Sequence, residues 1–121
     1  MKEYILSKGH LKEKGITSFN AGWRTFAISF DPDLTEEEIK CWGKTDFDQA
    51  IIHLDDSMYG ELLRETLLHE ITHILLETVG YGDYDDGDHD RSHNNERLTI
   101  LVSRAFLQAM NLNNELFSIL L

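Results

Sequence analysis

The chain has 121 residues, a formal net charge of −11 at pH 7, and 41% hydrophobic and 27% charged residues. This length and composition predict one soluble globular domain, residues 1–121, with a single core. A chain this acidic argues against nucleic-acid binding, which depends on basic groups that neutralise phosphates. The sequence has no apolar run of membrane-spanning length, no signal-peptide pattern, and Cys41 as its single cysteine. We therefore expect a cytoplasmic protein that makes no contact with membranes.

The first half of the chain predicts short strands separated by turns. Residues 2–6 and 23–30 are rich in β-forming side chains, and the second segment alternates polar and apolar positions. Gly15 and the segment 20–22 look like turns. Thr35 followed by three glutamates has the pattern of a capping box, which predicts a short helix over 35–42 that ends at Gly43. Residues 46–55 read as one further strand.

The second half predicts helices. Asp55, Asp56 and Ser57 offer N-cap side chains for a helix over 58–79, which Gly80 and Gly82 would end. After a loop of about a dozen residues, Ser92 can cap a second long helix over 93–110, and Asn113 and Asn114 a short one over 115–121. Strands followed by helices predict an α+β fold, with a small antiparallel or mixed sheet packed on the first long helix and on the second.

The most informative segment lies inside the first long helix and reads His69-Glu70-Ile71-Thr72-His73. Residues four apart lie on the same side of a helix, so both imidazoles can bind the same ion. Glu70 would lie beside that ion, where it can accept a proton from water. This is the H-E-x-x-H pattern of zinc peptidases, in which zinc keeps one open position for a water molecule.

Two ordinary histidines and a solvated glutamate are the alternative interpretation, because three fixed residues in five recur by chance. The surrounding residues favour the metal site. The helix carries apolar residues on nearly all sides, which predicts that it is largely buried. Buried histidines and a buried glutamate would be costly without a partner, and a metal ion is a suitable one.

Two imidazoles hold zinc weakly, so a third protein ligand is expected. Glu96 is the preferred candidate, because an early turn of a packed helix is a rigid position. His89 and His93 are alternative ligands. Glu96 could also have no metal-binding role and be an exposed glutamate that the helix dipole favours in the first turn. The acidic stretch 81–92 does not fit an EF-hand when aligned on Gly87, and we interpret it as a solvated loop.

The chain resembles the small phage- and prophage-encoded zincin-like metallopeptidases, which are minimal relatives of the gluzincins and of the ImmA/IrrE type. The resemblance depends on the segments 43–51, 65–73 and 93–98 and covers about residues 43–110. Relatives often carry two adjacent glutamates after an asparagine in the third segment, and here Asn95 fills the first of those positions. The resemblance implies a zincin-like fold and a cytoplasmic peptidase.

The resemblance also implies roles for single residues. His69 and His73 would be zinc ligands, Glu96 the third ligand, and Glu70 the general base that moves a proton from water to the leaving amine. A donor for the tetrahedral oxyanion is also needed, and we expect a peptide or protein substrate to add as a strand along residues 50–54. The donor candidates are Tyr81, Tyr84, His89 and His93, and the strand positions are Ala50, Ile52 and Leu54.

Two other functions fit the same sequence. An inactive zincin scaffold that serves as a phage or prophage binding protein would need little room for a cleft, which suits a chain of 121 residues. Retention of Glu70 argues against it, since zinc binding alone does not require that residue. A hydrolase of non-peptide amides would use the same site. The sequence does not define the oligomeric state.

Overall fold

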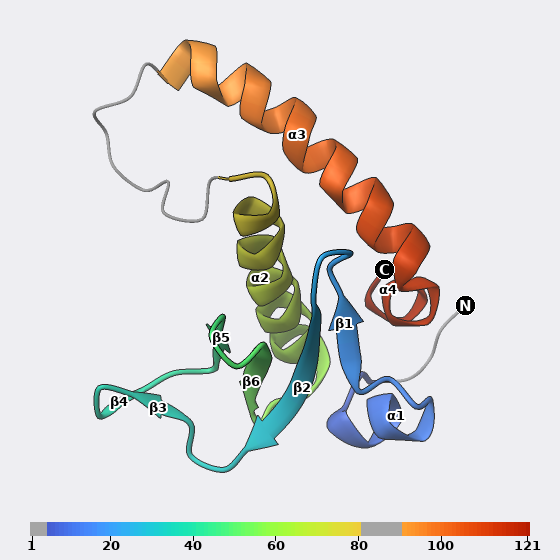
Figure 1. Ribbon diagram of the computed structural model, residues 1–121. Coiled ribbons are helices and arrows are strands. Elements are labelled where there is room, and N and C mark those ends of the chain that lie inside the picture. The colour runs from blue at the N-terminus through green and yellow to red at the C-terminus, as the bar shows by residue number, and fades with distance from the viewer. Residues whose placement is uncertain (1–4, 81–90) are drawn as a thin grey trace.

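The computed structural model describes the backbone of residues 5–80 and 91–121 and the side chains of 5–80 and 97–121 (Figure 1). Four helices and six strands follow one another within these ranges. In chain order they are α1 (Lys8–Glu13), β1 (Ser18–Asn20), β2 (Thr25–Asp31), β3 (Thr35–Glu36), β4 (Ile39–Lys40), β5 (Gly43–Asp46), β6 (Ile51–Asp55), α2 (Gly60–Thr78), α3 (Arg91–Leu112) and α4 (Asn114–Leu120).

The main sheet has four strands in the order β1-β2-β6-β5, and β3 and β4 form a separate hairpin. β2 and β6 are parallel, whereas β1 pairs with β2 and β5 pairs with β6 in the antiparallel sense. Helix α2 packs beside this sheet, and the long helix α3 leads to α4 near β1 and α1 (Figure 1). The predicted α+β class with a mixed sheet and two long helices is therefore confirmed.

The hydrophobic core lies between the sheet and α2. Phe26, Ile52 and Leu54 are fully buried on the strands, and α2 contributes Leu67 and Ile71 among others. A fully buried side chain of this size stabilises the fold by about 1.5–3 kcal/mol relative to an exposed one. Four residues of α4 extend the same core: Leu116, Phe117, Ile119 and Leu120. The sheet, α2 and α4 thus share one core.

Among the described side chains of helix α3, the buried ones lie in its C-terminal half. Ala105 and Ala109 are buried, whereas Ile100 is 49% exposed. The Asn113 side chain does not cap α4 as predicted but joins it to the sheet: it accepts a hydrogen bond from the Asn20 amide (2.7 Å) and donates to the Asn20 carbonyl (2.8 Å). No helix in the described ranges is both long and apolar enough to cross a bilayer.

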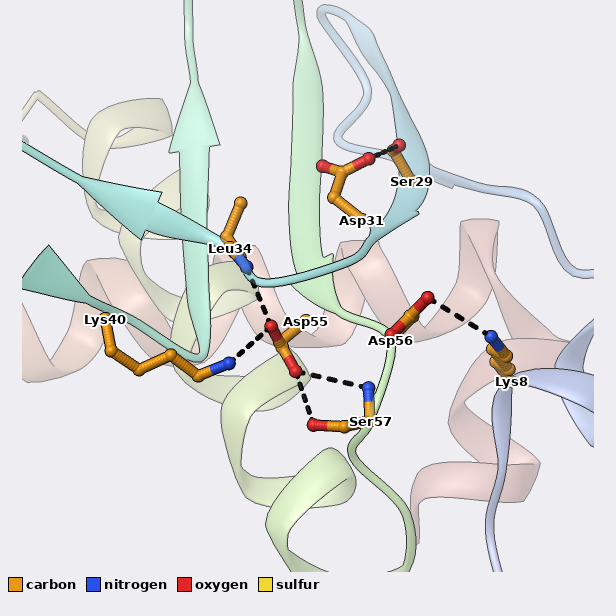
Figure 2. A network of polar contacts seen from close by, with 8 residues as sticks. All are labelled: Lys8, Ser29, Asp31, Leu34, Lys40, Asp55, Asp56 and Ser57. Atoms are coloured by element: carbon orange, nitrogen blue, oxygen red, sulfur yellow. Dashed lines mark hydrogen bonds and ion pairs between the residues drawn. The ribbon is translucent and has the colours of Figure 1, made fainter. Parts of the chain in front are cut away.

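Asp55, at the end of β6, is the centre of a polar network that joins the β3–β4 hairpin to the segment before α2 (Figure 2). Its carboxylate accepts hydrogen bonds from the Leu34 amide (2.8 Å), the Lys40 ammonium (2.7 Å) and the amide and hydroxyl of Ser57. These donors, Lys40 first, lower the pKa of Asp55. Asp55 therefore caps the turn at Ser57, and not the helix α2, which begins at Gly60 without a side-chain cap.

Three predicted elements differ in the structure. Residues 5 and 6 are not in a strand, and Ser7 makes only an isolated bridge to Tyr59. The helix predicted over 35–42 is the β3–β4 hairpin, because Glu37 and Glu38 adopt positive φ angles of 53° and 68° in its turn. The strand predicted over 46–55 is divided by a turn over 47–50 into the end of β5 and the whole of β6.

Candidate metal centre

Helix α2 carries the two histidines of the motif on its solvent side. The predicted helix is confirmed, with Gly80 at its C-terminal end in the left-handed conformation (φ 87°). Its buried side is formed by Leu63, Leu67, Glu70, Ile71, Ile74 and Leu75. His69 and His73 are exposed, so the prediction that these side chains are buried is wrong. The apolar residues of α2, such as the 41% exposed Leu62, do not all reach the core.

The two imidazoles lie close enough to share one ion. The Nε2 atoms of His69 and His73 are 3.0 Å apart, and the rings meet edge to face with centroids 4.6 Å apart. Two zinc–nitrogen bonds of about 2.0–2.1 Å at a tetrahedral angle place such nitrogens roughly 3.3 Å apart. Nitrogens at this separation either share a proton or direct both lone pairs at one cation. The pair therefore fits zinc with only a small movement of the rings.

Glu70 lies next to this pair and is only 5% exposed. Its Oε1 atom accepts a hydrogen bond of 2.8 Å from the Thr45 hydroxyl. Thr45 pairs with the buried Ile52 across β5 and β6, which directs both side chains toward α2. The edge strand β5 thus holds one oxygen of Glu70, and within the described residues its Oε2 atom accepts no hydrogen bond.

Gly43 permits this close approach of α2 to β5. A Cβ atom at this position would lie 2.8 Å from Thr66 Cγ2 and 3.3 Å from both Cγ and Oε2 of Glu70. A contact below 3.0 Å requires a neighbour to move, so any side chain here would displace the helix or the base. Neither Gly43 nor Thr45 was expected to belong to the site, because their role depends on a strand register that the sequence pattern does not define.

The candidates for the predicted third ligand are residues whose side chains the structure does not describe. The backbone of His93 and Glu96 belongs to the first turns of α3, but their side chains lie outside the described residues, as do Tyr81, Tyr84 and His89 altogether. Within 5–80 and 97–121, no three His, Cys, Asp or Glu side chains gather closely enough to hold a metal ion. The described part of the candidate centre is therefore the histidine pair with Glu70.

The substrate strand predicted along Ala50, Ile52 and Leu54 is wrong. β6 is paired on both sides, with β2 and with β5, so it has no free edge. Ile52 and Leu54 are also fully buried, and Ala50 lies in the turn before β6 with a φ of 59°. The strand that has a free edge beside α2 is β5.

A cavity of about 330 Å³ opens between β5 and α2 next to the histidine pair. It is lined by Trp42, Gly43, Glu65, Thr66, His69 and Glu70. Glu70 and His69 therefore line a cavity that adjoins the edge strand β5. Cys41 lies nearby, but burial raises the pKa of its thiol, which disfavours a thiolate nucleophile.

A second histidine–carboxylate pair lies away from the motif. His53 Nδ1 is 2.6 Å from Asp31 Oδ2, and this hydrogen bond is the main cause of the lowered pKa of Asp31. Ser29 donates a further hydrogen bond to Asp31 (2.9 Å). His53 alternates with Ile52 and Leu54 along β6, so it lies on the face of the sheet opposite α2. We interpret this pair as a structural link between β2 and β6.

Comparison of the chain with models of protein families, with curated proteins and with solved structures gives no match.

Proposed function

We propose that the protein is a zincin-like, zinc-dependent hydrolase of peptide bonds, with His69 and His73 as two zinc ligands and Glu70 as the general base. The single observation that carries this proposal is the geometry of the motif. Two imidazole nitrogens lie 3.0 Å apart, and Glu70, which lines the same cavity as His69, is a buried carboxylate with one oxygen held by Thr45. Zinc bound there would polarise the substrate carbonyl and lower the pKa of a water molecule to about 7.

Other residues of the chain would position Glu70 and the substrate. Thr45 donates to Oε1 of Glu70 and so fixes the plane of the carboxylate. The other oxygen is then available to accept a proton from the attacking water and to return it to the leaving amine. The free edge of β5 offers backbone amides and carbonyls to an extended substrate at the border of the cavity.

Glu96 is proposed as the third ligand, with His93 and His89 as alternatives. Zinc content distinguishes them, since Glu96→Ala should lower zinc affinity strongly and His93→Ala should not. The reverse result would assign the ligand to His93. The proposal includes zinc as the cofactor, a peptide or protein as the substrate and a phage-type context. The alternative is an inactive scaffold that binds a partner.

The test compares wild-type protein with Glu70→Gln on a panel of peptides, with zinc added and with zinc removed by a chelator. The amide preserves the shape of the side chain but cannot accept the proton, so turnover should fall at least about a hundredfold. The matched control is Glu115→Gln, an exposed glutamate on α4, which should leave turnover unchanged. Wild-type turnover that persists in Glu70→Gln would contradict the assignment, and turnover by neither protein would favour the binding scaffold.

A further inference from the structure

Two glutamates extend the line of motif histidines along α2. Glu65 precedes His69 by four residues, and Glu77 follows His73 by four residues. Residues four apart lie on neighbouring turns, so Glu65, His69, His73 and Glu77 form one row that is inclined to the helix axis. All four side chains are exposed. The histidine pair therefore has a carboxylate one turn away in each direction along the helix.

Each glutamate lines a cavity together with a tryptophan. Glu65 and Trp42 belong to the cavity of about 330 Å³ beside β5. Glu77 and Trp23 belong to a larger cavity of about 550 Å³ at the other end of α2, which is also lined by Ala21, Gly22, Thr78 and Gln108. Figure 1 shows the β1–β2 connection next to the C-terminal end of α2. Both segments contribute lining residues to the second cavity.

Both indoles are half-exposed and held in place. Trp23 is 50% exposed, donates a hydrogen bond of 2.7 Å to the Thr78 hydroxyl and packs edge to face on Phe26. Trp42 is 42% exposed, and the Lys40 ammonium lies 4.8 Å from its ring centre. Indoles held in this way can present a ring face to a ligand at a small cost in conformational entropy.

The two glutamates carry charges that the described residues leave unpaired. Glu61, one turn before Glu65 on α2, forms an ion pair with Arg64. The carboxylates of Glu65 and Glu77 form no ion pair and accept no hydrogen bond within the described residues. A carboxylate beside an indole is a combination that recognises ammonium and guanidinium groups. The net charge of −11 further favours a cationic ligand.

We propose that one extended polypeptide binds along α2 with one basic side chain in each of the two cavities. The peptide bond to be cleaved would then lie at the histidine pair, between the two basic residues. The substrate class of the proposed peptidase is then a basic polypeptide segment, so this inference rests on the proposed function. Twelve residues separate Glu65 from Glu77, which corresponds to about 18 Å along the helix axis. An extended chain rises about 3.3 Å per residue, and side chains an even number of positions apart lie on the same face, so the two basic residues should be about six positions apart.

The test measures peptide binding to zinc-loaded Glu70→Gln protein, in which a substrate would bind without turnover, through the fluorescence of the tryptophans. The probe is an alanine-based peptide with two lysines six positions apart, compared with peptides in which norleucine replaces one or both lysines. A cation–π contact and an exposed ion pair together should make each lysine strengthen binding about fivefold. A peptide with lysines two positions apart should lose the contribution of one lysine.

Glu65→Gln and Glu77→Gln, each added to the Glu70→Gln protein, should weaken binding of the two-lysine peptide about fivefold and leave binding of the norleucine peptide unchanged. Glu115→Gln is the matched control and should change neither affinity. Equal affinity for the lysine and norleucine peptides would overturn the inference, as would equal effects of all three variants. Binding of basic peptides without turnover by wild type would refute only the proposed function. Turnover that ignores peptide charge would refute only the proposed substrate class.

Discussion

Asp55 and Glu70 are the two buried charged side chains among the residues that the structure describes, and their surroundings differ. Asp55 is 1% exposed and receives hydrogen bonds on both oxygens from Leu34, Lys40 and Ser57. Glu70 has one donor, Thr45, and its side chain lines a cavity together with His69. A carboxylate with all its acceptors used stabilises the fold, whereas one with a free oxygen next to two imidazoles is available for chemistry.

Asp55→Ala should have the largest effect on stability, because it leaves the Leu34 amide and the Lys40 ammonium without their acceptor. We expect the free energy of unfolding to fall by about 3 kcal/mol, at the low end for a broken buried pair because Lys40 is partly exposed. Denaturant titration measures this change. Asp56→Asn is the control: its ion pair with Lys8 is long (3.6 Å) and exposed, so the loss should stay below about 1 kcal/mol. Equal losses in both variants would contradict the structural role of Asp55.

Gly43→Ala should have the next largest effect on stability, and it should also disturb the position of Glu70. The added methyl group overlaps Thr66 and presses on Glu70, so we expect a loss of about 2 kcal/mol in stability together with a loss of any turnover of at least about tenfold. Gly9→Ala is the control, since a Cβ there would lie 3.8 Å from Ser7 Oγ, an ordinary contact. Full stability and turnover in Gly43→Ala would show that α2 and β5 are not in this close contact.

The smallest expected effect is the change in the stability of Asp55 variants at acid pH. Since the pKa of Asp55 is lowered in the folded state, its stabilising effect is complete above the unfolded value of about 3.9 and is lost as pH falls toward the folded value. In metal-free protein, wild type should lose about 1 kcal/mol more than Asp55→Asn between pH 7 and pH 3. Urea titrations at both pH values measure the difference. Parallel losses in the two proteins would mean that Asp55 is not ionised in this network.

The sequence predicted the local part of the site well and the non-local part poorly. The positions of His69, Glu70 and His73 on one helix follow from helical periodicity alone, and α2 has the predicted extent to within two residues. Glu70 is buried as predicted, but the predicted burial of the two histidines is wrong, because apolar residues around a helix do not reveal which side the sheet covers. Only the strand register brings Thr45 and Gly43 to Glu70.

The β3–β4 hairpin shows how long-range contacts override a local signal. The pattern that begins at Thr35 favours a helix start, but Lys40 reaches the Asp55 carboxylate and the Cys41 amide bonds the Leu34 carbonyl (3.1 Å). These contacts require a tight reversal at Glu37 and Glu38. The same hairpin leads into β5, which covers the edge of β6 that was expected to bind substrate. Neither contact has a periodic pattern in the sequence.

The most direct test of the central claim, that His69 and His73 bind one zinc ion, is the zinc content of protein purified without added metal, combined with a competition titration against a chromogenic chelator. Wild type should hold close to one zinc per chain, His69→Ala and His73→Ala should lose it, and His10→Ala on α1 should retain it. Full zinc retention in either motif variant, or wild-type protein that binds no zinc in the titration, would contradict the account.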